Sequence, residues 1–326
     1  MSILQAIGNT PLIEIPSLSK LTGSRILLKC ENLNPGGSIK DRAAKLMIFN
    51  AIADGRLQKG MTIIEGTAGN TGIGLAIVGK SLGFDVKIVM PNNQAKEKER
   101  LIEFYGAELV LVPPCPFADQ NHFYHTARRI AEESPDKYFW VNQFENLDNF
   151  HAHYAHTGPE IWEQTNGKID YLVSAAGTGG TIGGCSNFLK EQNPAIKVVL
   201  VDPEGSGLAN FFRHGEFKSS GSSITEGIGI MRLVANFKKA IIDDAFTLPD
   251  QDLVSIAHHV KKHDNIILGA SAALNVAAAY KIAKACEPGQ TIITFWCDGG
   301  ERSASKLYNP DFLKSKNLLM DSALPT

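Results

Sequence analysis

The sequence predicts an α/β protein in which a mainly parallel sheet is covered by helices. Apolar runs rich in β-branched residues alternate along the chain with stretches of helical periodicity, which is the pattern of strands joined by crossover helices. With 326 residues and 44% hydrophobic composition, the chain can bury a large core, and its length fits one large domain or two lobes. No repeat or low-complexity tract marks a boundary between lobes.

Seven apolar runs have the length and composition of buried strands, and several stretches between them have helical spacing. We expect strands at 62–65, 85–90, 108–112, 139–143, 171–174, 197–201 and 291–296. We expect helices at 96–105, 118–133 and 253–262, and in the alanine-rich run after Ser271. The last residues, from about Ser315, are expected to form a loose tail.

The charges and cysteines limit which ligands and which kinds of site the chain is expected to have. The chain has 32 basic and 34 acidic residues, and its formal net charge of -2 comes without a basic stripe. Small molecules are therefore expected as ligands, rather than nucleic acid or a membrane. The 5 cysteines are widely spread and form no CxxC pair, which argues against a disulfide framework and a zinc site. The chain opens without a signal-peptide pattern and has no apolar run of transmembrane length, so we expect a cytoplasmic protein.

Two glycine-rich loops have the form of anion-binding sites. Residues 65–72, EGTAGNTG, lie between a predicted strand and an apolar helical run. Their backbone N–H groups and the helix dipole can hold a carboxylate or a phosphate, although such polar starts are also common as simple helix caps. Residues 174–184, SAAGTGGTIGG, also follow a strand, and their nest of N–H groups suits a phosphate monoester. Ile182 breaks the GxGxxG spacing, so a nicotinamide cofactor is disfavoured.

Two other motifs are interpreted as having no chemistry of their own. Residues 74–81 match GxxxxGK[ST] letter by letter, but the apolar run 75–78 continues a helix, whereas a phosphate loop must be flexible. His151, His153 and His156 lie close together, yet no acidic or thiol ligand stands beside them at helical spacing. We therefore expect no metal site.

Lys40 is the candidate chemical centre. It follows a tight glycine turn in NPGGSIKDR, and both anion-binding loops come later in the chain. An isolated lysine is usually a solvated surface charge. A lysine combined with a phosphate nest and a carboxylate loop is what pyridoxal phosphate chemistry on an amino acid requires. The amine forms an imine with the cofactor aldehyde and, once displaced, can move the substrate α-proton.

Five segments, NPGGSIKDRAA, EGTAGNTGIGLA, AAGTGGTIGG, EGIG and GASAALNVAAA, occur in this order along the chain. In this order they resemble the cysteine synthase and cystathionine β-synthase family of pyridoxal phosphate enzymes, and the similarity runs from Ile7 to about Tyr308. The resemblance implies the type II fold, similar to that of tryptophan synthase β, with two lobes that each hold a mainly parallel sheet flanked by helices. The larger, cofactor-binding lobe would comprise residues 1–41 and 148–326, and the smaller, mobile lobe residues 42–147. The resemblance also implies a homodimer.

The same resemblance implies a role for each site residue. Lys40 would be the catalytic Schiff-base lysine, Asn70 would bond the cofactor's ring hydroxyl, and Ser271 would meet the pyridine nitrogen. A neutral hydroxyl there does not keep that nitrogen protonated, which favours β-elimination over transamination. The phosphate would lie on Gly177, Thr178, Gly179, Gly180 and Thr181, and the substrate on Thr67, Ala68, Gly69, Thr71, Gln143 and Gly227.

The activity implied by the resemblance is that of a cysteine synthase, which replaces the acetate of O-acetyl-L-serine by sulfide through an aminoacrylate. The rim departs from most such enzymes. Ala68 replaces the serine of TSGNTG, residues 143–148 lack the usual proline and alanine, His156 stands where threonine is common, and residues 298–303 read DGGERS. These variants resemble a branch that includes cysteine desulfhydrases, which release sulfide from cysteine. Desulfhydrase activity is therefore the alternative, followed by cystathionine β-synthase-like activity or a catalytically silent binding protein.

Overall fold

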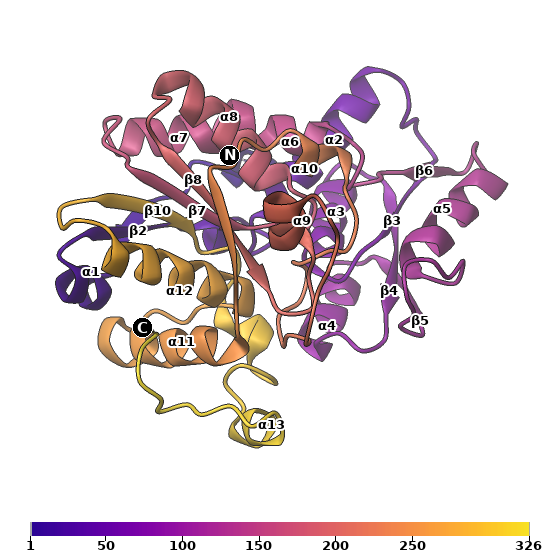
Figure 1. The fold of residues 1–326 in the computed structure, drawn as a ribbon. Helices are drawn as coiled ribbons and strands as arrows, with labels where there is room; N and C mark the ends of the chain where they lie inside the picture. Colours follow the sequence, from indigo (N-terminus) through magenta and orange to yellow (C-terminus); the bar gives the residue numbers. More distant parts are fainter. Residues whose placement is uncertain (1, 326) are drawn as a thin grey trace.

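The computed structural model describes residues 2–325 and contains two sheets (Figure 1). The larger sheet has the strand order β1-β2-β10-β7-β8-β9, and the smaller sheet has the order β5-β4-β3-β6. β1 pairs antiparallel with β2, and the other neighbouring strands run parallel. The strands are β1 Leu12–Glu14, β2 Arg25–Lys29, β3 Thr62–Gly66, β4 Asp85–Pro91, β5 Glu108–Val112, β6 Tyr138–Trp140, β7 Tyr171–Ala175, β8 Lys197–Pro203, β9 Asp244–Leu248 and β10 Thr291–Phe295.

All seven predicted strands are present, and three others were missed. The missed strands are β1, β2 and β9. β1 has 3 residues and β9 has a broken burial pattern, so neither produces an apolar run. The prediction of a strand at 139–143 was too long, because Asn142 has a φ of 52° and turns the chain out of extended geometry.

The helices cover both faces of the larger sheet and most of the smaller one (Figure 1). They are α1 Pro16–Thr22, α2 Lys40–Ala53, α3 Asn70–Ser81, α4 Lys96–Phe104, α5 Phe123–Glu133, α6 Asp148–Ala152, α7 Gly158–Gln164, α8 Gly180–Gln192, α9 Leu208–His214, α10 Ala235–Lys238, α11 Asp250–Asp264, α12 Ala270–Ala285 and α13 Pro310–Ser315. The segment 74–81 lies within α3, which confirms that its phosphate-loop pattern is helical. The helix predicted at 118–133 begins only at Phe123, because His122 caps it by accepting from the Tyr124 N–H.

Alternate residues of the larger sheet enter opposite cores, as expected for strands buried on both faces. Val173 and Ile292 belong to the core beneath α11 and α12, whereas their neighbours Leu172 and Ile293 belong to the core against α8. The smaller sheet is divided in the same way, with one core against α2 and α3 and another against α5. This two-sided burial leaves the carboxyl ends of the strands as the place where loops gather.

The C-terminal segment is docked rather than loose. Leu318, Met320 and Leu324 pack against the core of α11 and α12. The Gln251 side chain accepts from the Leu319 N–H at 2.9 Å and donates to the Leu319 carbonyl at 2.8 Å. The expectation of a loose tail from about Ser315 was therefore wrong, because spaced apolar residues in a short irregular segment give no local periodic signal.

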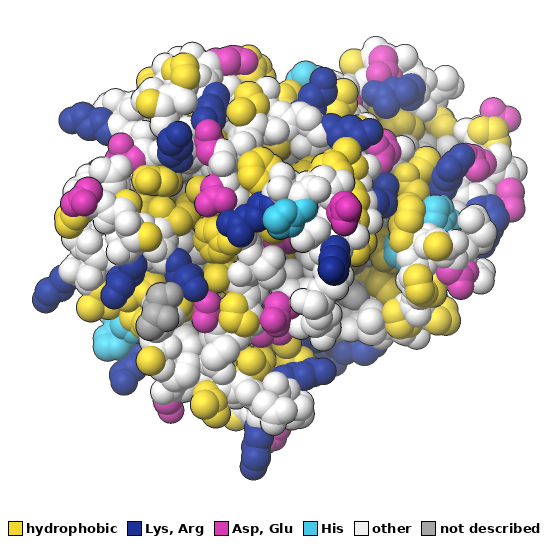
Figure 2. Space-filling view, in the orientation of Figure 1, with side chains coloured by type: hydrophobic (Ala, Val, Ile, Leu, Met, Phe, Trp, Pro, Cys, Tyr) yellow, Lys and Arg dark blue, Asp and Glu magenta, His cyan; other side chains and the backbone are white. Residues whose placement is uncertain are grey.

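The visible surface has a mixed character. Figure 2 shows Lys and Arg side chains scattered among acidic and apolar ones, without a single basic patch on this face. Among the described residues, no helix is both long and apolar enough to cross a membrane.

Candidate active site

A cavity of about 190 Å³ lies between the two sheets, beside the carboxyl ends of β3 and β7. Open α/β sheets place ligand sites at this edge, because loops and helix N-termini converge there. Every predicted site residue except Gly180 lines this one cavity. These residues are Lys40, Thr67, Ala68, Gly69, Asn70, Thr71, Gln143, Gly177, Thr178, Gly179, Thr181, Gly227 and Ser271.

Lys40 is the first residue of α2 and lines the cavity. The turn before it is closed by a 2.7 Å hydrogen bond from the Gly37 N–H to the Asn34 carbonyl, and Gly37 has a φ of 71°, which favours glycine. Burial lowers the pKa of the Lys40 amine more than the neighbouring Cys297 and Asp298 raise it. A lowered pKa increases the neutral fraction of the amine, which is the form that attacks an aldehyde.

The loop 177–181 leads from β7 into α8 and has no room for side chains at two glycines. A Cβ on Gly177 would lie 2.3 Å from the Gly227 carbonyl oxygen, and a Cβ on Gly179 would lie 2.4 Å from Phe237 Cα. Gly179 also has a φ of 83°. The loop therefore keeps its backbone accessible at the N-terminus of a 13-residue helix, where N–H groups and the helix dipole favour an anion. These features fit a phosphate group.

The threonines of this loop are held by a neighbouring buried segment. Asn149 Nδ2 donates to Thr178 Oγ1 at 2.9 Å, and His153 Nε2 lies 3.3 Å from Thr181 Oγ1. Burial lowers the pKa of His153 well below its usual range, so the imidazole is neutral. Among residues 2–325 no group of three or more His, Cys, Asp or Glu is arranged to hold a metal ion. His153 instead supports the phosphate loop.

The loop 67–71 lies across the cavity from the phosphate loop, at the start of α3. Thr71 Oγ1 donates to Gln143 Oε1 at 2.6 Å, so two predicted substrate residues contact each other. The Gln143 amide also donates to Glu65 Oε1 at 3.3 Å and to the Gly66 carbonyl at 3.2 Å. Burial raises the pKa of Glu65 to about 8, against hydrogen bonds that lower it. The floor beneath the loop is therefore a protonated, uncharged carboxyl at neutral pH.

Asn70 is held by two residues of the segment after β10. Its Nδ2 donates to Asp298 Oδ2 at 2.7 Å, and its Oδ1 accepts from Arg302 Nη1 at 2.8 Å. Arg302 also donates to the Gly36 carbonyl in the turn before Lys40. The altered DGGERS segment thus joins the Lys40 turn to the start of α3. The second N–H of the Asn70 amide stays available for a group in the cavity.

Ser271 lies in the first turn of α12, beside a thiol that the sequence analysis did not single out. Cys297 follows β10 and lines the cavity with Ser271. Asn275 Nδ2 donates to Cys297 Sγ at 3.3 Å. Burial raises the pKa of Cys297 to about 12, so the group is a neutral thiol. Its only sequence signal was its place directly after a predicted strand.

The rim of the cavity carries an ion pair that sequence reasoning also missed. Lys98 Nζ lies 2.6 Å from Glu226 Oε2, and Lys306 contacts the same carboxylate. Lys98 belongs to α4 beside the smaller sheet, whereas Glu226 precedes Gly227 beside the larger one. Lys98 lies in the charged run KEKER, which is typical of a solvated helix face, so its burial was not predictable from the sequence.

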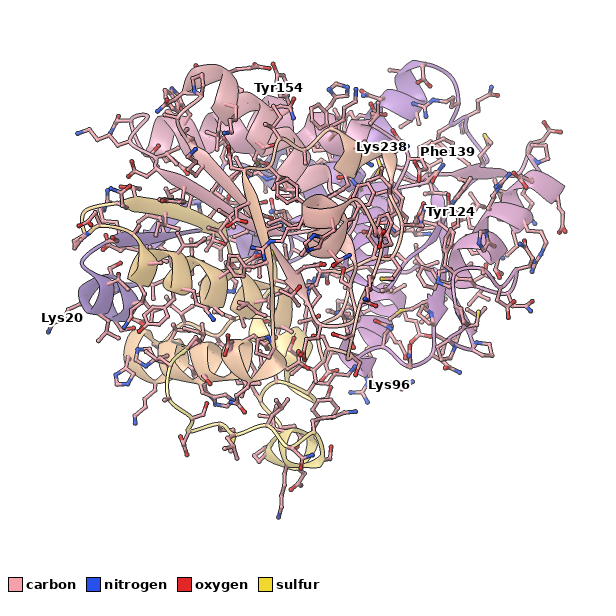
Figure 3. The ribbon with its side chains drawn as sticks, viewed as in Figure 1. Lys20, Lys96, Tyr124, Phe139, Tyr154 and Lys238 are labelled. Atoms are coloured by element: carbon pink, nitrogen blue, oxygen red, sulfur yellow. The ribbon has the colours of Figure 1, made fainter. Side chains whose placement is uncertain are left out.

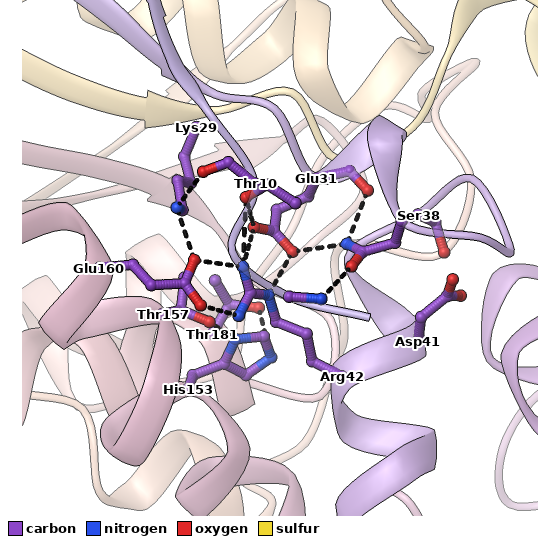
Figure 4. A network of polar contacts seen from close by, with 12 residues as sticks. Thr10, Lys29, Glu31, Ser38, Asp41, Arg42, His153, Thr157, Glu160 and Thr181 are labelled. Carbon is purple, nitrogen blue, oxygen red and sulfur yellow. Dashed lines mark hydrogen bonds and ion pairs between the residues drawn. The ribbon is translucent and has the colours of Figure 1, made fainter. Parts of the chain in front are cut away.

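A buried ion network anchors the first turn of α2 (Figure 4). Arg42 lies 2.6 Å from Glu31 and 2.7 Å from Glu160, and Lys29 lies 2.6 Å from Glu160. Burial raises the pKa of Glu160, but its hydrogen bonds and charge interactions with Arg42 and Lys29 outweigh burial and lower the pKa to about 2. Thr10 completes the network through its hydroxyl, which donates to Glu31 at 2.7 Å. The network fixes the helix from which Lys40 extends.

The chain belongs to the family of pyridoxal-phosphate dependent enzymes, whose model matches residues 3–298. Among curated proteins it is 45% identical to the cysteine synthase of Dictyostelium discoideum, over 97% of this chain and 86% of that protein. The fold is similar to the crystal structure of O-acetyl serine sulfhydrylase isoform 3 from Entamoeba histolytica, with a TM-score of 0.86 and 36% identity over 99% of this chain and 93% of that one.

The fold is also similar to that of a hydrogen sulfide-producing enzyme from Fusobacterium nucleatum, with a TM-score of 0.82 and 32% identity over 92% of this chain and 98% of that one. The family assignment, the type II α/β fold and the pyridoxal phosphate cofactor are thereby confirmed.

Proposed function

We propose that this enzyme is a cysteine synthase, which forms L-cysteine and acetate from O-acetyl-L-serine and sulfide. One observation carries the proposal: a buried lysine, a phosphate nest and a carboxylate loop from distant parts of the chain line a single cavity. The identity to cysteine synthases over nearly the whole chain supports the same activity.

The residues present fit pyridoxal phosphate. Its phosphate would lie on residues 177–181, where the glycines leave the backbone bare, and its ring would lie between Asn70 and Ser271. When bound, this cofactor withdraws electrons from the substrate α-carbon. Ser271 would present a hydroxyl rather than a carboxylate to the ring, which would suit β-elimination better than transamination.

The substrate carboxylate would be received by Thr67, Ala68, Gly69, Thr71 and Gln143, with Gly227 on the opposite wall. Lys40 takes the proton from the α-carbon, and the β-carbon to oxygen bond breaks with its electron pair leaving on acetate. Sulfide then forms a bond to the β-carbon, and the proton returns from Lys40 to the α-carbon. Acetate and cysteine account for all atoms of the two substrates.

We further propose two lobes, residues 1–41 with 148–326 and residues 42–147, that move against each other when substrate binds. The two sheets divide between these ranges, which supports the boundary.

We also propose a cytoplasmic homodimer. Light scattering during size-exclusion chromatography measures the mass directly, and a mass of one chain would contradict the dimer.

Cysteine desulfhydrase activity is the second candidate, favoured by Ala68 in the carboxylate loop and by the similarity to a hydrogen sulfide-producing enzyme. The deciding experiment uses one preparation with bound cofactor. It compares cysteine formed from O-acetylserine and sulfide with sulfide released from cysteine alone. Faster cysteine formation supports the synthase, whereas faster sulfide release reassigns the enzyme as a desulfhydrase.

The Ala68→Ser variant tests how this position sets the balance. Its added hydroxyl supplies one hydrogen bond near the substrate carboxylate, worth about 1 kcal/mol. We expect the KM for O-acetylserine to fall roughly fivefold, since 1.4 kcal/mol corresponds to about tenfold. Steady-state kinetics of both reactions measure the effect. An unchanged KM would remove Ala68 from the substrate site.

A further inference from the structure

Arg232 occupies an aromatic cage at the edge of the cavity. Its guanidinium carbon lies 4.3 Å from the ring centroid of Phe117, 4.9 Å from that of Tyr124 and 4.8 Å from that of Phe144. These distances lie within the ~6 Å over which a cation is attracted to a ring face. The Arg232 side chain is 22% exposed, so the cage removes much of its water. Desolvation strengthens cation–π attraction.

The cage brings together segments that lie beside the two different sheets. Tyr124 lies in the first turn of α5, which packs on β3 and β4 of the smaller sheet, and Phe117 lies in the loop before α5 (Figure 3 labels Tyr124). Phe144 directly follows Gln143 and lines the cavity. Arg232 itself comes from the segment between α9 and α10, which runs between the two sheets in Figure 1.

The segment that carries Arg232 is fixed to the larger sheet's side of the cavity. The Gly229 N–H donates to the Ala176 carbonyl at 2.8 Å, next to the phosphate loop. From the smaller-lobe range, Glu145 accepts from Arg232 Nη1 at 3.1 Å and from the Ala235 N–H at 2.9 Å, so it contacts the same segment across the lobe boundary. The Arg232 guanidinium therefore extends from a segment bonded next to the phosphate loop to aromatic rings of the smaller-lobe range.

We propose that Arg232 is a positioning residue that limits how far the cavity opens, because it binds the α5 side of the smaller sheet. Segment 226–230 forms the cavity wall beside it, so loss of this contact widens the entrance. The part of this inference that concerns substrate binding rests on the proposed cysteine synthase function. The limit on opening is a property of the chain and is measurable without turnover.

The test uses Cys297 as a reporter, because its thiol lines the cavity while Cys286 lies at the far end of α12. Cofactor-free wild type and Arg232→Met are treated with N-ethylmaleimide, and the labelling rate of each cysteine is followed by peptide mass spectrometry. Methionine keeps a flexible unbranched side chain but removes the charge and the planar group. Arg232→Lys keeps the charge alone, and Arg213→Met, at an exposed arginine paired with Asp244, is the control.

We expect Arg232→Met to raise the labelling rate of Cys297 about tenfold, Arg232→Lys to raise it less, and Arg213→Met to leave it unchanged. Cys286 should react at the same rate in all four proteins. An unchanged Cys297 rate in Arg232→Met would overturn the proposal, and so would an equal rise at both cysteines, because that indicates general loosening. Thermal unfolding midpoints confirm that the variants are folded.

The role in substrate binding is tested in the holoenzyme. Arg232→Met should raise the KM for O-acetylserine about tenfold, because a wider cavity encloses the substrate less well. The kcat should change less than about twofold, because the reacting groups stay in place. An unchanged KM would overturn this role. If the protein formed no cysteine at all, the proposed function would fail, while the Cys297 labelling rates would still decide whether Arg232 limits the opening of the cavity.

Discussion

At the scale of single residues, the environment changes what common side chains can do. Lys40 is a lysine like many others in the chain, but it lines the cavity at the start of α2, and burial there lowers its pKa. Glu65 is likewise converted by burial from an acid into a neutral hydrogen-bonding group at pH 7. Both changes follow from the cost of placing a charge where water is excluded.

Replacing Lys40 by alanine tests the central residue. Lys40→Ala should lose the absorbance band of the lysine-bound cofactor and reduce turnover on the order of a thousandfold, because the group that carries the proton is missing. Lys45→Ala, on the same helix, is the matched control and should keep both. Retention of the band and of turnover in Lys40→Ala would show that another residue holds the cofactor.

The raised pKa of Glu65 predicts how stability depends on pH. The folded protein keeps this proton up to about pH 8, whereas the unfolded chain loses it near pH 4.5, so stability from this group falls as the pH rises between these values. As the pH rises through this range, the free energy of unfolding of Glu65→Gln should fall less steeply than that of wild type, by on the order of 1 kcal/mol per pH unit. Urea unfolding at several pH values measures it, with exposed Glu132→Gln as control. Parallel curves for wild type and Glu65→Gln would contradict the assignment.

At the scale of elements, the helix that begins with Lys40 depends on charges behind it. Arg42 in its first turn is buried with Glu31 and Glu160, and Glu160 also neutralises the fully buried Lys29. A buried ion network stabilises little by itself, but removal of one member leaves an uncompensated charge. The network therefore makes the direction of α2 sensitive to a single substitution outside the cavity lining.

Glu160→Gln keeps the size of the side chain and removes its charge. We expect it to lower the free energy of unfolding by ~3–5 kcal/mol at pH 7, because Lys29 and Arg42 stay buried. The pKa of Glu160 is lowered to about 2, so the difference from wild type should shrink as the pH falls from about 4.5 toward 2. Urea unfolding measures it, and exposed Glu163→Gln on the same helix should match wild type. A Glu160→Gln protein as stable as wild type would mean that the network is not anchoring α2.

At the scale of the whole molecule, the site exists because two sheets present their strand ends to one cavity. The carboxylate loop follows β3, the phosphate loop follows β7, and contacts such as Lys98 with Glu226 join the two sides. The C-terminal segment belongs to the same assembly, since it covers the helices beneath the larger sheet.

Deletion of the chain from residue 317 onward tests the docked segment. It removes Leu318, Met320 and Leu324 from the core of α11 and α12, and we expect a loss of about 3 kcal/mol, given that full burial of one such side chain contributes ~1.5–3 kcal/mol. Chemical unfolding measures the loss. Leu319→Ser is the control. Leu319 is 66% exposed, so this substitution should leave the free energy of unfolding unchanged. A truncated protein with unchanged stability would show that the contacts contribute little.

The sequence by itself determined the parallel α/β class, both glycine loops and the candidate lysine, because these depend on local periodicity and on glycines that local geometry demands. Tertiary structure alone decided that Lys98 and Arg232 contact residues across the cavity, that Cys297 lies beside Ser271, and that the C-terminal segment is docked. The physical reason is that burial of a charge or thiol is set by residues distant in the chain. A charged run such as KEKER has the same sequence pattern on a solvated helix and at a cavity rim. Only the residues that the fold packs against it decide which of its side chains are buried.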